Sequence, residues 1–224
     1  SIFESINNAN SIFFQSEFSK SLVQSHYGSL ISSSEVILNG IDIKEKNTCS
    51  ENQKDKISNK KIILCSAKWR GFKRLDATIK VVATLRKDIN CELQIIGDTG
   101  GVNVGYDFVK CIGDISHSEM SSYLRNADLF LHLAWLDNCP NSVIEAIGVR
   151  LPVVCSNIGG TREIVEATKG GIVSVCDTEV DYTSLVDLHN PPEPDYNILV
   201  SDIKNIFDKY EEIVEKIDTE AIDI

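Results

Sequence analysis

The sequence predicts an α/β fold, a doubly wound parallel sheet joined to a fragment of a second domain. From Lys60 onward, short runs rich in Val and Ile alternate with segments of helical pattern, which is typical of βα units built on a parallel sheet. The apolar runs are continuous rather than alternating, as strands buried on both faces require. Short connections with right-handed crossovers then give a doubly wound arrangement.

Six strands and four helices are expected in this part of the chain. The strands are predicted at 62–66, 92–97, 108–113, 128–134, 152–156 and 171–175. The helices are predicted at 73–87, 116–126, 141–149 and 160–168. Ser116 and Glu119 have the S-x-x-E spacing of a capping box at the start of the second helix. A proline-rich stretch at 189–197 is predicted to be a loop, and apolar residues at helical spacing predict a closing helix over 202–217.

The first 60 residues have a different character. Residues 7–28 predict one strand followed by one helix, and 36–43 predict a second strand. Two strands and a helix cannot close a core of their own, so we interpret them as the truncated tail end of an N-terminal domain, as the missing initiator Met also suggests. The predicted parts are this tail at 1–43, a polar linker at 44–60, the sheet domain at 61–197, and a C-terminal helix and tail at 198–224.

Composition argues against several classes of protein. The 224 residues carry a formal charge of −11, which repels phosphates unless basic residues are segregated, so general binding of nucleic acid or of an anionic membrane is not expected. No apolar run approaches the roughly 20 residues of a spanning helix, and the opening residues lack the pattern of a signal peptide. The cysteines are scattered singly without a C-x-x-C pair, which indicates reduced thiols in a cytosolic core. They are Cys49, Cys65, Cys91, Cys111, Cys139, Cys155 and Cys176.

A basic cluster interrupts this acidic composition. Lys68, Arg70, Lys73 and Arg74 lie within seven positions in the turn after the strand at 62–66. In open α/β sheets ligands bind beyond the carboxyl ends of the strands, and a helix N-terminus there can complete a diphosphate site. The other interpretation is a solvated basic helix start, because short charge runs are usually surface. The turn lacks G-x-G-x-x-G, which weakens an NAD-binding interpretation.

A second candidate site follows the strand at 128–134. Asp137 lies in the predicted loop and Glu145 in the predicted helix, so both carboxylates can point into one cleft and accept hydrogen bonds from hydroxyls. Ser142 and Glu145 also have capping-box spacing, which would use Glu145 on its own backbone instead. The amides of the intervening stretch can face a diphosphate at the start of the helix. That stretch is Asn138, Cys139, Pro140, Asn141 and Ser142.

Several runs of this sequence resemble one known family. D-N-C-P-N-S-V-I-E-A, followed by L-P-V-V-C-S-N-I-G-G-T-R-E-I-V, resembles the E-x7-E signature region of family 4 GT-B glycosyltransferases, in which the carboxylates flank the donor. K-W-R-G-F-K-R-L-D is similar to the donor-diphosphate turn of the family, with Lys73 matching its lysine and Lys68 or Arg70 its arginine. The segments at 94–101 and 106–134 match the elements before the signature, and those at 13–23 and 36–42 look like the last elements of the N-terminal domain.

The resemblance implies a retaining hexosyltransferase (EC 2.4) that moves a sugar from a nucleotide diphosphate to an acceptor hydroxyl. This chain would carry mainly the donor-binding half and be inactive alone. Lys68, Arg70 and Lys73 would offset the diphosphate charge, Glu145 would hold the ribose and Asp137 the donor sugar, which makes the two carboxylates the catalytic candidates. No cofactor and no metal are expected, since the chain has no D-x-D pair.

The expected partners are a nucleotide sugar and an acceptor that is a glycan, a lipid or a small molecule. Nucleic acid is not expected, and a cytoplasmic protein would touch a membrane only through the missing N-terminal domain. A non-catalytic module that binds a sugar nucleotide stays an alternative. A Rossmann oxidoreductase or epimerase would need the glycine fingerprint and a Tyr–Lys pair, neither of which is visible.

The sequence departs from the family pattern in two respects. Asp137 replaces the usual first glutamate, which shortens its reach by one methylene. The N-terminal half of the family, with its acceptor site and a histidine near the reacting sugar, is missing. The histidines present are interpreted as surface or core residues. They are His26, His117, His132 and His189.

Overall fold

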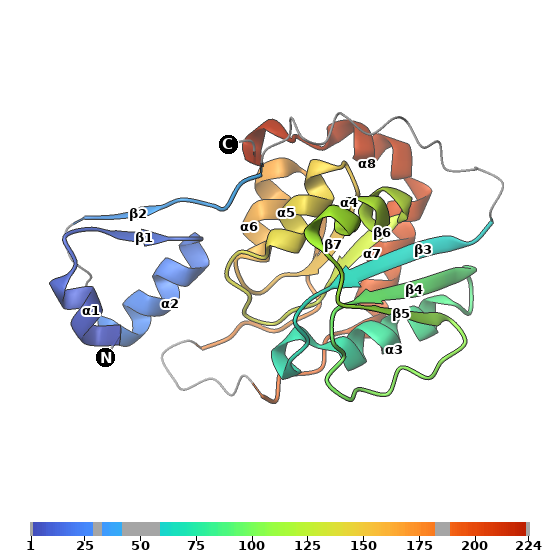
Figure 1. Ribbon diagram of the computed structural model, residues 1–224, viewed down its shortest axis with the longest axis horizontal. Coiled ribbons are helices and arrows are strands. Elements are labelled where there is room, and N and C mark those ends of the chain that lie inside the picture. The colour runs from blue at the N-terminus through green and yellow to red at the C-terminus, as the bar shows by residue number, and fades with distance from the viewer. Residues whose placement is uncertain (1, 29–32, 42–58, 182–188, 223–224) are drawn as a thin grey trace.

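The computed structural model describes residues 2–28, 33–41, 59–181 and 189–222 (Figure 1). Its centre is a six-stranded parallel sheet in the order β5-β4-β3-β6-β7-β8. The strands are β3 (Lys61–Ser66), β4 (Cys91–Ile96), β5 (Val109–Gly113), β6 (Leu129–His132), β7 (Val153–Ser156) and β8 (Gly171–Ser174). Each predicted strand is present, and the predicted fold class is confirmed.

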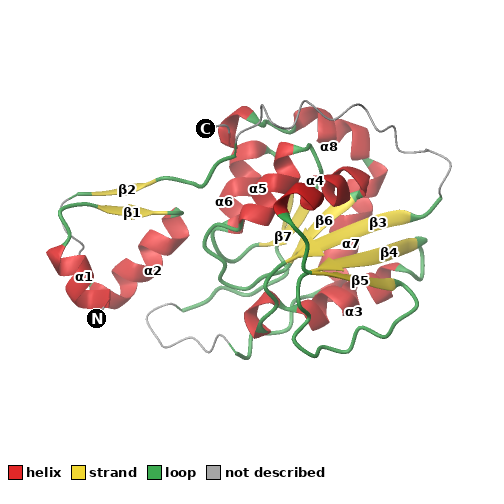
Figure 2. Ribbon diagram, in the orientation of Figure 1, coloured by secondary structure: helices red, strands yellow, loops and turns green. Residues whose placement is uncertain are grey.

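Helices cover both faces of this sheet, as Figure 2 shows. The helices α3 (Leu75–Leu85) and α7 (Tyr196–Asp208) share one apolar core with the sheet. The second core, on the other face, is shared with α4 (His117–Asn126), α5 (Asn141–Gly148) and α6 (Thr161–Thr168). Neighbouring residues of one strand therefore belong to different cores, which is why the strands read as continuous apolar runs.

The strand order reverses between β3 and β6. From β3 the chain builds outward through β4 to β5, then returns to the other side of β3 and continues through β6 to β8. β3 and β6 are therefore neighbouring strands, and the loops that follow them leave the same edge of the sheet before the chain continues in opposite directions. In an open α/β sheet this is the point where a crevice forms beyond the carboxyl ends of the strands.

Helix boundaries differ from the predictions where the backbone leaves the helical region. The helix predicted from residue 73 begins at Leu75, because Arg74 is in the left-handed conformation with φ 54° after a 3-10 turn at Gly71–Lys73. The closing helix begins at Tyr196, inside the predicted loop, with Asp195 accepting from the N–H groups of the next turn. It breaks at Lys209, before α8 (Tyr210–Lys216).

The N-terminal part forms a separate small unit. It consists of α1 (Ile2–Asn8), β1 (Ile12–Phe14), α2 (Glu17–Tyr27) and β2 (Ser34–Val36), with β1 and β2 paired in parallel. The first predicted strand and the predicted helix are present, whereas α1 is not predicted. The second strand, predicted at 36–43, ends at Val36 and so shares only that residue with the prediction. The unit lies beside α6 (Figure 1), and Glu163 accepts the N–H groups of Glu17 at 2.8 Å and Phe18 at 2.7 Å. Most of the predicted linker at 44–60 lies outside the described residues.

The described cysteines are free thiols, most of them within the core. Only Cys111 is exposed among those six, and Cys49 lies outside the described residues. Burial raises the pKa of Cys91 to about 11 and that of Cys176 to about 12, so both stay protonated near neutral pH. Among the residues described, no helix has the length and apolar character needed to cross a membrane.

Candidate functional site

Two loops meet where the strand order reverses. One follows β3 and holds the basic cluster, and the other follows β6 and holds the acidic stretch. The backbone N–H of Trp135 donates to the carbonyl of Phe72 at 2.7 Å, which joins the two loops directly. At the start of α5, the hydroxyl of Ser142 donates to the carbonyl of Ser66 at 3.4 Å. The structure thus brings together the two segments that the sequence singled out.

The basic turn presents three of its four cations toward solvent or the crevice. Lys68 and Arg70 are exposed, and Lys73 is partly buried. The Lys73 ammonium crosses to the other loop and donates to Asp137 Oδ2. This contact sets a positive and a negative side chain side by side at the carboxyl edge of the sheet.

Arg74 does not join the other three cations, although the sequence groups it with them. Its guanidinium is buried and makes a bidentate pair with Asp177, at 2.9 and 2.7 Å, and it also donates to the carbonyl of Pro192 at 2.8 Å. The inclusion of Arg74 in the anion-attracting cluster is therefore wrong. Its partner Asp177 lies far along the chain, after β8, so no local sequence pattern indicates that Arg74 pairs with this carboxylate.

Asp137 has two donors on one oxygen. Besides Lys73, the Nε2 atom of His132 lies 3.2 Å from Asp137 Oδ2. Burial by itself would raise the pKa of Asp137, but the hydrogen bond from His132 and the charge and hydrogen bond of Lys73 outweigh it and hold that pKa well below its usual range. Asp137 is therefore an ionised acceptor at neutral pH.

The backbone around Asp137 is strained and closely packed. Leu136, directly before it, has φ 62°, a left-handed conformation that is costly for a residue with a side chain. The Asp137 carbonyl accepts the N–H of Gly160 at 2.7 Å. A Cβ atom on Gly159 would lie 2.7 Å from the same carbonyl oxygen, so this approach requires glycine. Three features thus fix one acidic residue in the loop.

The stretch after Asp137 leads into α5. Asn138 is exposed, whereas Cys139 and Pro140 are buried directly before the first helical residue. The side-chain oxygen of Asn141 accepts from the Nδ2 group of Asn39 at 2.8 Å, which links the helix start to the chain segment after β2. The bond from Ser142 to Ser66 places the N-terminal end of α5 beside the end of β3, where the predicted diphosphate would lie.

Glu145 lies one turn inside α5, and the capping-box interpretation of it is wrong. The helix begins after Pro140, so Ser142 is a helical residue and its hydroxyl bonds to Ser66 instead. Glu145 Oε1 is 3.2 Å from the Nε2 atom of His117, a largely exposed residue at the start of α4. Its carboxylate thus contacts the first residue of α4 rather than its own backbone.

The contact between His132 and Asp137 is not predicted from the sequence. His132 is a core residue, as expected, but its ring also contacts Asp137. Its position could have indicated this contact, because His132 is the last residue of β6, and the last residue of a parallel strand lies at the edge where ligands bind. His117 is a surface residue, as expected, yet it lies beside Glu145.

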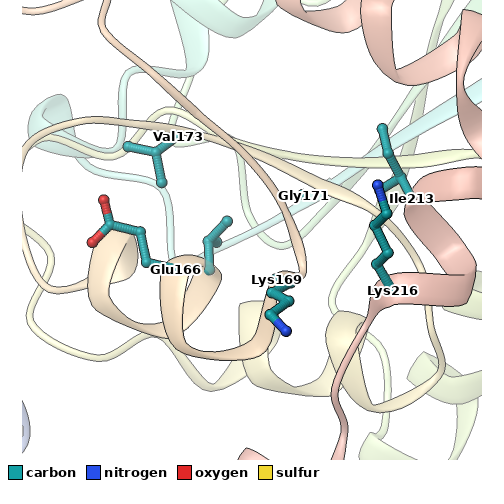
Figure 3. Close-up of a pocket in the computed structure, with 7 residues that line it drawn as sticks. Glu166, Lys169, Gly171, Val173, Ile213 and Lys216 are labelled. Carbon is teal, nitrogen blue, oxygen red and sulfur yellow. The ribbon is translucent and has the colours of Figure 1, made fainter.

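A cavity of 380 Å³ lies elsewhere, beside the edge strand β8 and between α6 and α8 (Figure 3). Val165, Val173 and Ile213 are its apolar lining residues, and its charged side chains are Glu166, Lys169 and Lys216. Figure 3 shows that these three point in different directions rather than toward one point. They form no convergent polar site. Within the described ranges, no three His, Cys, Asp or Glu side chains gather in a way that could hold a metal ion.

Comparison with solved structures finds the same fold. HepE from Anabaena, in a complex with UDP, has a TM-score of 0.70 at 17% identity, over 98% of this chain and 61% of that one. Sucrose-phosphate synthase from Thermosynechococcus elongatus has a TM-score of 0.69 at 17% identity, over 99% of this chain and 57% of that one. This chain therefore spans about three fifths of the length of these proteins.

Comparison of sequences gives the family. The chain is 35% identical over 52 residues to a putative teichuronic acid biosynthesis glycosyltransferase, TuaC of Bacillus subtilis (strain 168), which is 23% of this chain and 13% of that protein. The family model described as glycosyl transferases group 1 matches residues 48–188, more than half of the chain. The chain therefore belongs to the glycosyl transferases group 1 family, and its helix-covered parallel sheet is that of a GT-B glycosyltransferase.

Proposed function

We propose that this chain is the donor-binding part of a retaining glycosyltransferase that transfers a hexose-type sugar from a nucleotide diphosphate to an acceptor hydroxyl. The observation that carries the proposal is the contact between Lys73 and Asp137 where the strand order reverses. A diphosphate needs a cation and a sugar hydroxyl needs an acceptor, and this contact supplies both at the edge where ligands bind.

The basic turn is the proposed diphosphate site. When the bond between the anomeric carbon and the diphosphate breaks, its electron pair stays on the departing diphosphate. Lys68, Arg70 and Lys73 would stabilise that charge because they are already placed when it develops. The N–H groups at the start of α5, between Asn138 and Ser142, would add to the same field. With this positive charge supplied by side chains, the proposal includes neither a metal ion nor another cofactor.

The two carboxylates are the proposed hydroxyl acceptors. Asp137 is ionised and lies next to Lys73, so a sugar attached to the diphosphate would lie within its reach. Glu145 would accept hydrogen bonds from the ribose, and its side chain is mostly buried between two helices, where such a bond is less exposed to water. Each charge-assisted hydrogen bond of this kind contributes about 1.5–3 kcal/mol.

The acceptor side of the reaction belongs to the rest of the protein under this proposal. The chain spans about three fifths of the length of HepE and of sucrose-phosphate synthase, so a second lobe would complete the cleft and this chain alone would be inactive. The acceptor would be a glycan, a lipid or a small molecule, and nucleic acid would not be a partner. A cytoplasmic location is proposed, with any membrane contact made by the N-terminal domain.

Titration calorimetry of this chain with UDP, GDP and ADP tests the proposal. The solved HepE complexes contain UDP or UDP-glucose, so UDP is the first ligand to use. We expect weak but saturable binding of one nucleoside diphosphate, because most of its contacts lie on this half. Lys73→Ala should weaken it, whereas Lys80→Ala, a matched change on the exposed face of α3, should not. Absence of saturable binding of all three at millimolar concentration would overturn the donor-site assignment.

A further inference from the structure

Asp137 is held by one oxygen only. Both of its side-chain donors, Lys73 Nζ and His132 Nε2, bond to Oδ2. Within the described part of the chain, no hydrogen bond reaches Oδ1. The carboxylate therefore has one occupied oxygen and one that can accept from a ligand.

The two donors differ in how freely they can move. Lys73 is the last residue of a short 3-10 turn and carries its ammonium on a long flexible stem. His132 is 5% exposed, ends strand β6, and stacks on Phe130 with their ring centroids 6.5 Å apart. The lysine can follow a ligand, whereas the histidine is fixed by the sheet.

The protonation of His132 suits a permanent donor. Desolvation by burial lowers its pKa, although Asp137 opposes that effect, so the ring is neutral near neutral pH. A neutral imidazole carries one N–H, and an ionised carboxylate only accepts. The Nε2 atom must therefore hold the proton, and it donates to Asp137 without adding a buried charge.

We propose that His132 is a positioning residue for the donor sugar: it keeps Asp137 in place through Oδ2 when Lys73 turns to the diphosphate, and so leaves Oδ1 facing the sugar. This inference rests on the proposed function. It explains how an aspartate, one methylene shorter than the glutamate of the family pattern, has a fixed direction, since its backbone and one oxygen are both held. The left-handed Leu136 and the Gly160 N–H fix the backbone part.

The contact is tested first without any nucleotide. In protein labelled with ¹⁵N at histidine, His132 should show the Nε2–H tautomer, with a proton resonance shifted by the carboxylate. Lys73→Met imitates a lysine drawn away by the diphosphate, and this resonance should persist in it. Asp137→Asn should move it. Loss of the resonance in Lys73→Met would mean that His132 cannot hold Asp137 alone, which overturns the proposal.

The role toward the sugar is tested by comparing UDP-glucose with UDP in the same full chain, or the matching pair if GDP or ADP is the nucleotide bound. His132→Leu should weaken binding of the nucleotide sugar at least fivefold more than binding of the nucleoside diphosphate. His132→Gln keeps an N–H donor at a similar reach and should restore most of that difference. In an Asp137→Asn background, His132→Leu should cause no further loss.

The remaining outcomes separate this inference from the function on which it rests. His132→Leu is first checked for folding by circular dichroism. If it and His132→Gln bind each of the two ligands with the same affinity as wild type does, His132 does not position a sugar ligand. If the wild type binds no nucleotide, the proposed function fails and the sugar role fails with it, whereas the labelled histidine still reports whether the ligand-free contact exists. If nucleoside diphosphate and nucleotide sugar weaken equally in His132→Leu, the residue is merely structural.

Discussion

Lys73 and Arg74 are neighbours in the chain, carry the same charge and each pair with an aspartate, yet the two pairs differ. The side chains of Arg74 and Asp177 are each 1% exposed, and a backbone carbonyl satisfies the guanidinium further. Those of Lys73 and Asp137 are 15% and 16% exposed and lie at the ligand-binding edge of the sheet. Burial thus separates a structural ion pair from one that a ligand can open, because separating an enclosed pair would leave an unpaired charge in the protein interior.

The largest effect is expected at the enclosed pair. Arg74→Met leaves the buried Asp177 carboxylate without its partner, so the free energy of unfolding should fall by about 3–5 kcal/mol, as when a buried pair is broken on one side. Urea denaturation followed by circular dichroism measures it. Arg162→Met, which breaks an exposed pair with Glu166, is the control and should change stability by less than about 1 kcal/mol. Equal effects of the two changes would remove the distinction between enclosed and exposed pairs.

The next effect concerns the pair that a ligand can open. Lys73→Ala should weaken nucleoside diphosphate binding by about 1.5–3 kcal/mol through loss of a charge-assisted contact, with the fold intact. Calorimetry with the diphosphate and with the bare nucleoside separates the phosphate contact from the rest, since nucleoside binding should change far less. An equal loss for both ligands, or an unfolded variant, would make Lys73 as structural as Arg74.

The third prediction concerns Glu145, a carboxylate that contacts His117 and, among the described contacts, no lysine. Glu145→Gln replaces a charged acceptor by a neutral one, so nucleotide affinity should fall by about 1 kcal/mol or more while thermal stability stays nearly constant. 2′,3′-Dideoxynucleotides should bind wild type and variant alike, because the diol that Glu145 contacts is gone. Glu166→Gln, on the exposed side of α6, is the matched control.

The outcome is read as a coupling free energy between the carboxylate and the diol. A value of at least about 1 kcal/mol assigns the ribose to Glu145, as a hydrogen bond to a charged group requires. A value near zero, with stability retained, removes Glu145 from the site.

The smallest effect is a pH dependence of stability that comes from His132. Its pKa is lowered in the folded protein relative to the ordinary value of 6.5, chiefly by burial. As the pH falls below about 6.5, the unfolded chain takes up a proton that the folded chain does not, so folding stability decreases by at most about 1.4 kcal/mol per pH unit.

His132→Gln lacks this proton uptake and serves as the reference. The stability of the wild type relative to His132→Gln should therefore decrease between pH 7.5 and 5.5, measured by urea denaturation at each pH. A difference that stays constant or grows as the pH falls would show that His132 is not buried as a neutral ring.

The six strands of the large sheet, the class of that sheet and the place of the two candidate loops follow from the sequence alone. Continuous Val- and Ile-rich runs can be satisfied only between two layers of helices, and the loops that follow parallel strands must emerge at one edge. The capping box at Ser116 was also predictable from the sequence, because Ser116 and Glu119 are three positions apart and contact each other within one helical turn.

The tertiary structure was needed to show which charged side chains are enclosed and where α3 and α7 begin. Arg74 meets Asp177 across 103 positions, so no local pattern could distinguish it from Lys73. His132 meets Asp137 because the loop turns back at the left-handed Leu136, a conformation that the residue type does not announce. Ser142 and Glu145 keep capping-box spacing but lie inside a helix that starts earlier. Spacing reports contacts within one turn, whereas these contacts depend on segments that only the assembled sheet brings together.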